Sequence, residues 1–198
     1  MIRLGAAALA ASALAACVVL PGGEGPPPPP CAVTVDGSLN ASEWEDAQRI
    51  ELTNGATLWL KQTQSHVCFA VEPGDAGPRF VDVFIADRAG TLHNLHASMQ
   101  VGERTLPARR WTDEEPPTAW GQTTGWTANA ATTLDPETHG PSIEQVAPFD
   151  GYEFVIDRAH LNPWRIRVEV RDFHGEARDI VWPAGSRRTD IATWAVLP

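Results

Sequence analysis

Lysine is nearly missing from this sequence: Lys61 is the sole lysine, so almost all of the positive charge is arginine. Acidic residues outnumber basic ones, and the formal net charge is -10 at pH 7. Arg109-Arg110 and Arg187-Arg188 are adjacent pairs within this acidic chain, not long basic runs. Because duplex binding depends on cations clustered on one face, this charge distribution argues against a nucleic-acid partner.

The short motifs of common enzyme chemistries are also missing. The chain has no Gly-x-Ser-x-Gly elbow, no Gly-rich phosphate loop and no His-Glu-x-x-His. Glycoside hydrolysis by two carboxylates stays open, because it depends on their separation in space. We nevertheless expect a domain that binds and does not catalyse.

No sequence pattern of an ordinary metal site is present either. Asp82 and Asp87 flank an apolar segment, and Asp113-Glu114-Glu115 is a short acidic run, but neither forms an EF-hand loop. Calcium needs six to eight converging oxygens, so these acids are expected to be solvated surface. We expect no metal and no cofactor; calcium and haem are retained as alternatives.

No apolar run is long enough to span a bilayer. The short apolar run at the N-terminus is typical of a signal peptide. Arg3 precedes a stretch of small apolar residues, 4–16, that falls short of the roughly twenty residues a membrane helix needs. Leu14-Ala15-Ala16-Cys17 resembles the lipobox of bacterial lipoproteins. The resemblance implies cleavage of residues 1–16 and attachment of diacylglycerol to Cys17. The alternative is an ordinary secretory signal that happens to contain a cysteine.

Residues 17–30 have the composition of a tether. Glycines and then five consecutive prolines make a core impossible here and favour extended polyproline II, at ~3.1 Å per residue. The lipid on Cys17 would hold the protein at a membrane. Val18, in place of Asp, implies the outer membrane by the sorting rule of enteric bacteria. We therefore expect a location in the cell envelope.

Cysteine is scarce, with three in all. Once Cys17 is lipidated, Cys31 and Cys68 remain as an even pair in an oxidising compartment, which predicts a disulfide. Cys31 is expected to open the first strand and Cys68 to lie within another. Two buried free thiols are the alternative.

Sustained helical periodicity is absent, and short alternating segments take its place. Residues 31–36, 57–61, 66–71, 80–86, 95–101, 152–156 and 165–171 alternate between apolar and polar side chains, with turn residues between them. This pattern predicts one all-β domain over residues 31–198, an antiparallel β-sandwich. Ser42 and Glu45 fit a capping box, which predicts a short helix with Ser42 as N-cap. A second helical turn is expected over residues 157–161.

Several segments together resemble family 9 carbohydrate-binding modules and their DOMON-like relatives. The opening signature is Val35-Asp36-Gly37-Ser38-Leu39 followed by Trp44, and strands at 67–71, 80–87, 151–156 and 167–172 follow in the same order. The resemblance covers most of residues 31–198 and implies a β-sandwich that binds glycans. Asn40 and Ala41 stand where the family often has an acidic residue, which weakens an inherited calcium site. Residues 102–150 do not align.

The unaligned stretch contains the predicted ligand readers. Trp111, Trp120 and Trp126 lie among Pro, Gly and Thr, where exposed indoles could stack on sugar rings while Arg109 and Asp113 bind hydroxyls. The alternative is that these tryptophans cap the sandwich, since Trp is usually well buried. The function expected is capture of a carbohydrate or small polar ligand, beside a surface hydrolase or transporter.

Two other functions compete with glycan capture. One is a structural or partner-binding lipoprotein whose tryptophans are all core. The other is a haem electron carrier, because some DOMON-like domains hold haem between Met and His. His93, His96 and Met99 cluster here, but on one strand His93 and Met99 share a face that His96 opposes. A second element would have to supply an axial ligand.

Overall fold

The computed structural model describes residues 30–74, 79–98, 100–107, 124–129, 150–172 and 179–197. The predicted signal, Cys17 and the tether up to residue 29 lie outside these ranges, as do Arg109, Trp111, Asp113 and Trp120.

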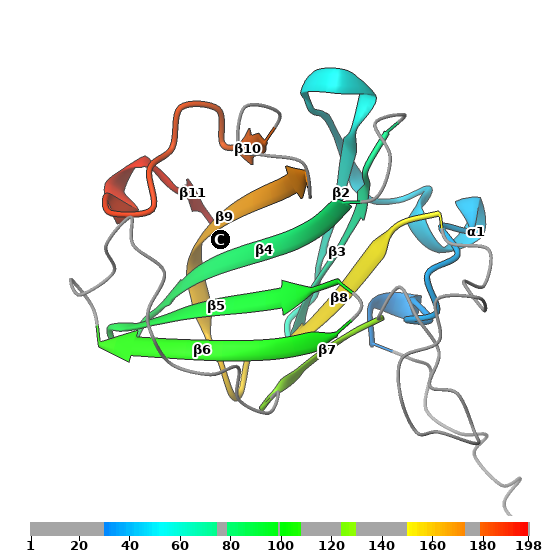
Figure 1. The fold of residues 1–198 in the computed structure, drawn as a ribbon. Coiled ribbons are helices and arrows are strands. Elements are labelled where there is room, and N and C mark those ends of the chain that lie inside the picture. The colour runs from blue at the N-terminus through cyan, green and yellow to red at the C-terminus, as the bar shows by residue number, and fades with distance from the viewer. Residues whose placement is uncertain are drawn as a thin grey trace, which may run out of the picture.

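Two antiparallel sheets form the domain (Figure 1). Sheet A has the order β1 (Gln48–Glu51), β2 (Thr57–Gln62), β3 (His66–Glu72), β8 (Tyr152–Asp157) and β7 (Trp126–Ala128). Sheet B has the order β10 (Ile180–Trp182), β9 (Pro163–Asp172), β4 (Arg79–Asp87), β5 (Thr91–Ala97) and β6 (Val101–Pro107), and β11 (Ala195–Val196) also pairs with β9. Helical segments are short: η1 (Pro30–Ala32), α1 (Ala41–Trp44), η2 (Thr53–Gly55) and η5 (Ile191–Thr193). The predicted all-β sandwich is confirmed.

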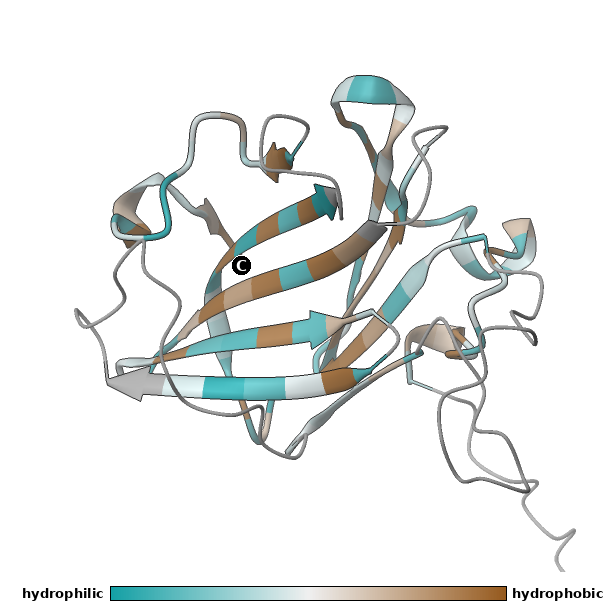
Figure 2. Ribbon diagram, viewed as in Figure 1, coloured by the Kyte–Doolittle hydropathy of each residue, from teal (hydrophilic) through white to brown (hydrophobic). Residues whose placement is uncertain are grey.

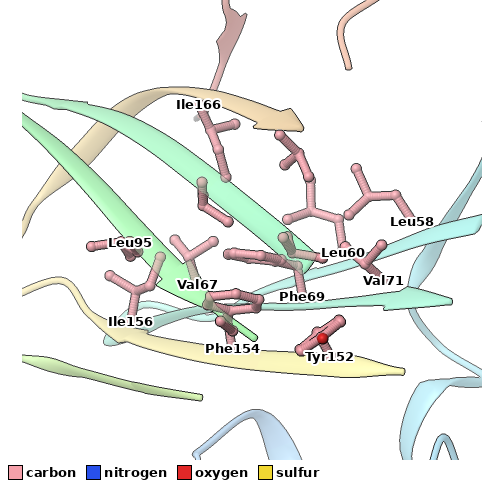
Figure 3. Packing of buried hydrophobic residues seen from close by; sticks show 14 of the residues in the cluster. Leu58, Leu60, Val67, Phe69, Val71, Leu95, Tyr152, Phe154, Ile156 and Ile166 are labelled. Atoms are coloured by element: carbon pink, nitrogen blue, oxygen red, sulfur yellow. The ribbon is translucent and has the colours of Figure 1, made fainter. Parts of the chain in front are cut away.

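The core lies between the sheets, where the period-two alternation of each strand places its apolar side chains. On β9 the buried Ile166, Val168 and Val170 alternate with arginines and a glutamate, and Figure 2 shows this as bands of brown and teal. Phe69 and Phe154 stack at the centre with ring centroids 4.7 Å apart (Figure 3). Full burial of such a side chain contributes roughly 1.5–3 kcal/mol, so this layer supplies much of the stability.

The expected strand over residues 95–101 is in fact two strands joined by a turn. β5 ends at Ala97, β6 begins at Val101, and the Ser98 N–H donates to the Gln100 carbonyl at 2.9 Å. Ala97 and Val101 are register partners across this hairpin. The inward alternation therefore continues across the turn, which is why the sequence pattern reads as one strand.

The segment after Cys31 was also expected to be a strand and is not. It begins with η1 and continues without ladder hydrogen bonds across the outer face of sheet A. There Val33 and Trp44 are buried against Ala70 and Val155. The helix α1 follows, but Asn40 is its N-cap residue, so the predicted capping by Ser42 is wrong. The helical turn at residues 157–161 is confirmed, since the Leu161 N–H donates to the Asp157 carbonyl at 3.1 Å.

The predicted disulfide between Cys31 and Cys68 is present, with 6.4 Å between the Cα atoms. Because Cys68 lies within β3 at the middle of sheet A, the bond ties the start of the domain to that sheet. In the chain-entropy model, closing a loop of this length stabilises the fold by about 4 kcal/mol.

A second anchor of the N-terminal segment is the carboxylate of Glu153, whose side chain is fully buried on the outer face of sheet A. One oxygen accepts from the backbone N–H groups of Asp36 and Gly37, at 2.9 and 2.8 Å, and the other from Trp44 Nε1 at 3.1 Å. Gly37 adopts a φ of 86°, which favours glycine at this turn. Burial raises the pKa of Glu153, and the three donors only partly offset that effect.

Glu153→Gln is expected to lower the free energy of unfolding by roughly 2 kcal/mol, because an amide offers one acceptor oxygen to donors that now share two. Urea denaturation of the purified, oxidised protein measures the change. Glu51→Gln is the matched control: this glutamate is 62 % exposed and paired with Arg49, so its loss should cost less than about 1 kcal/mol. Equal losses in the two variants would contradict the assigned role of Glu153.

Candidate functional site

The outer face of sheet B carries the side chains whose chemistry suits binding or catalysis. One end of this face is apolar and the other is polar. At the apolar end, Phe84, Ala86 and Leu92 are buried together with Trp194 from the C-terminal segment. At the polar end, Asp82 and Asn94 are buried despite their polarity. Outward-facing side chains of these strands are therefore covered at both ends of the face.

A cavity of about 280 Å³ lies at the apolar end, next to the turn between β4 and β5. Its apolar wall comes from the outer-face cluster and from η5, and its polar groups come from the turn. The lining residues are Ala86, Asp87, Arg88, Gly90, Thr91, Leu92, Trp164 and Ile191. The half-buried Trp164 carries the Arg165 guanidinium 4.7 Å from its ring centroid. The Trp164 indole, the Asp87 carboxylate and the exposed Arg88 guanidinium thus border one small cavity.

The cavity carboxylate, Asp87, is fixed by a chain of buried hydrogen bonds. It accepts from the Thr91 N–H at 2.7 Å, and its other oxygen lies 3.4 Å from His93 Nε2. His93 Nδ1 lies 2.8 Å from Glu103 Oε1, so both ring nitrogens face a carboxylate. Glu103 also accepts from Trp126 Nε1 at 2.8 Å. This chain holds the rim of the cavity to the inside of the sandwich.

The two carboxylates set the protonation of His93. Burial alone would lower the pKa of His93, but hydrogen bonds and charge from Glu103 and Asp87 outweigh it and raise that pKa. Burial acts in the opposite direction on Glu103, where the hydrogen bonds from His93 and Trp126 prevail and lower the pKa. A charged imidazolium between two carboxylates is the state that these groups favour.

Trp126, one of the predicted ligand readers, lies inside the core and not on a binding surface. It is 6 % exposed on β7 and stacks against Phe154 with ring centroids 6.0 Å apart. Its single N–H is bonded to Glu103. The alternative interpretation, a structural tryptophan, therefore describes Trp126. The sequence pattern concealed this because β7 has only three residues, too few to show alternation.

The structure also changes the expectation for several polar residues. Asp82 and Asp87 were expected on solvated surface, but their side chains are 4 % and 11 % exposed. His93 faces the core and His96 the outer face, as the strand alternation predicted, while Met99 lies outside the described residues. Trp164 is half-buried and borders the cavity. Among the described residues, no three His, Cys, Asp or Glu side chains converge as a metal site.

The raised pKa of His93 and the lowered pKa of Glu103 predict a pH dependence of stability. The contribution of His93 is complete below its unfolded pKa of about 6.5 and is lost as the pH rises through its higher folded pKa. The contribution of Glu103 is present above about 4.5 and is lost as the pH falls through its lower folded pKa. His93→Gln should therefore cost about 2 kcal/mol at pH 6 and clearly less at pH 9.

Urea unfolding at the two pH values measures this difference. His160→Gln is the control, because His160 also contacts a carboxylate, Asp157 at 2.8 Å, but is 57 % exposed. Its loss should change the unfolding free energy by less than about 1 kcal/mol at either pH. A loss from His93→Gln that is equal at pH 6 and pH 9 would refute the ion-pair assignment.

None of the helices that the structure describes has the length and apolar character to cross a membrane. Comparisons of the chain with protein-family models, with curated proteins and with solved structures each gave no match.

Proposed function

We propose that this protein is a lipoprotein of the cell envelope whose β-sandwich captures a carbohydrate or another small polar ligand. The observation that carries the proposal is the cavity on the outer face of sheet B, where Trp164 lies beside Asp87 and Arg88. The lipobox-like sequence before Cys17 and the proline-rich tether support the envelope location.

The mixed lining of the cavity suits a sugar. A sugar ring has apolar C–H faces and a rim of hydroxyls, so its sites combine an aromatic surface with a few polar groups. Trp164, Leu92 and Ile191 supply the apolar surface. Asp87 accepts hydrogen bonds from hydroxyls, and Arg88 donates them. Since Asp87 is already held by Thr91 and His93, little ordering of this carboxylate is needed on binding.

The described residues on either side of 108–123 belong to the β-sandwich. Strand β6 ends at Pro107, whose register partner is Thr91 on the cavity lining. The described chain resumes at Thr124, whose N–H donates to Glu103 Oε2 at 3.3 Å. Arg109, Trp111, Asp113 and Trp120 lie outside the described residues, so their proposed role as ligand readers is supported by the sequence alone.

A glycan array followed by tryptophan-quenching titration tests the proposal. We expect a saturable ligand, and Trp164→Leu should weaken its binding at least tenfold, since loss of a stacking aromatic ring costs about 1.4 kcal/mol or more. Trp59→Leu is the matched control, because Trp59 is also half-buried with an arginine, Arg49, 5.3 Å from its ring centroid, but lies on sheet A. The affinity of the Trp59→Leu variant for the ligand should stay unchanged.

The buried position of Trp126 favours a second candidate function, a structural lipoprotein that binds a protein partner such as a surface hydrolase or transporter. If the folded protein binds no glycan on the array, the result favours this second function. Equal weakening by Trp164→Leu and Trp59→Leu would remove the cavity from the binding site.

A further inference from the structure

A serine, a histidine and an aspartate form a hydrogen-bonded series at the polar end of the outer face of sheet B. Asp82 on β4 and His96 on β5 are direct register partners. His96 Nδ1 lies 2.9 Å from Asp82 Oδ1, and His96 Nε2 lies 2.8 Å from Ser98 Oγ. We propose that Ser98 is an activated nucleophile, with His96 as its general base and Asp82 as the residue that positions His96.

The buried carboxylate determines which nitrogen of His96 is available. A carboxylate only accepts hydrogen bonds, so the nitrogen that faces Asp82, Nδ1, carries the proton. In the neutral ring Nε2 then holds a lone pair, which faces the Ser98 hydroxyl. This is the orientation in which a histidine takes a proton from a nucleophilic serine.

Asp82 is itself held in place. Its side chain is 4 % exposed, it accepts from Asn94 Nδ2 at 3.2 Å, and Arg171 lies 3.6 Å from its second oxygen. On the other side of His96, the Phe80 ring packs with centroids 5.3 Å apart. The imidazole is therefore fixed on two sides, which is the preorganisation that a general base needs.

Ser98 lies in the turn between β5 and β6, where it remains partly exposed. The Gln100 N–H donates to Ser98 Oγ at 3.3 Å, and the Gln100 carbonyl oxygen lies 3.4 Å from the same hydroxyl. His96 Nε2, at 2.8 Å, is the nearer acceptor for the hydroxyl proton. The partly exposed hydroxyl is open to a substrate from solvent. The cavity of the proposed binding function lies at the other end of β5, six residues or roughly 20 Å from Ser98. The inference therefore goes beyond ligand capture and does not depend on it.

The chemistry that this arrangement supports is hydrolysis of an ester. Ser98 Oγ bonds to the ester carbonyl carbon while its proton passes to His96 Nε2. The tetrahedral adduct collapses, the C–O bond to the alcohol breaks, and the alcohol leaves with that proton. Water then attacks the acyl-serine, His96 takes a proton from this water and returns it to Ser98 Oγ, and the carboxylic acid departs. This extends the chain's function beyond the sequence-based expectation of binding alone.

A fluorophosphonate probe tests the nucleophile without knowledge of the natural substrate, because it reacts covalently with activated serines. We expect peptide mass spectrometry to place the label on Ser98, and Ser98→Ala to abolish it. His96→Gln should slow the labelling at least tenfold, in keeping with the 10²–10⁴-fold that a general base contributes. Turnover of p-nitrophenyl acetate should fall in parallel.

Ser65→Ala is the matched control. Ser65 Oγ also contacts a histidine, 2.9 Å from His66 Nδ1, but it occupies the nitrogen that in His96 faces the carboxylate. Labelling and turnover should be unchanged in this variant. Asp82→Asn tests the positioning role, because an asparagine can hold the other tautomer of His96. Labelling should slow at least tenfold in a protein that still unfolds cooperatively in urea.

Three results would overturn the proposal: no label on folded wild-type protein, a label on another serine, or the same labelling rate in wild type and His96→Gln. Ser98 and His96 are near the surface, so their variants keep the test decisive if Asp82→Asn fails to fold. Glycan binding at the Trp164 cavity is measured separately, so failure of one proposal is distinguishable from failure of the other.

Discussion

The buried carboxylate of Glu153 is the constraint on which the cover of the outer face of sheet A depends. A carboxylate removed from water without partners would cost several kcal/mol. The three described donors to the Glu153 carboxylate all come from the N-terminal segment: the backbone N–H groups of Asp36 and Gly37 and the indole N–H of Trp44. Sheet A can therefore bury Glu153 only if that segment crosses its outer face. Asn129 extends the anchor, since its side-chain oxygen accepts from the Glu153 N–H at 2.6 Å.

This cover divides the roles of the two outer faces. On sheet A the N-terminal segment, the disulfide and Trp44 fill the outer face with structural contacts. On sheet B the C-terminal residues cover the outer face around Trp194 and leave the cavity beside Trp164. Both proposed sites, the cavity beside Trp164 and the Ser98–His96–Asp82 series, consequently lie on sheet B, at the two ends of β5.

The sequence was sufficient to predict most of the strands, but not the residues that cover their outward faces. Alternation located β2, β3, β4, β8 and β9, because one face of each must be apolar. It could not separate β5 from β6, since Ala97 and Val101 are four positions apart in sequence and both point inward. It also treated Asp82 as solvated, because alternation identifies the outward face but not what covers it. That cover comes from residues distant in sequence, such as Arg171.

The hairpin of β4 and β5 connects the two proposed sites. His93 and His96 are three residues apart, so one faces the core and supports the cavity carboxylate while the other faces outward toward Ser98. A slip of one residue between these strands would exchange the two faces and remove both arrangements at once. The register is set at the turn, where Gly90 has a φ of 93° and the Thr91 N–H bonds to Asp87. The same residue, Asp87, therefore fixes the strand pairing on which Ser98 depends and presents a carboxylate to the cavity.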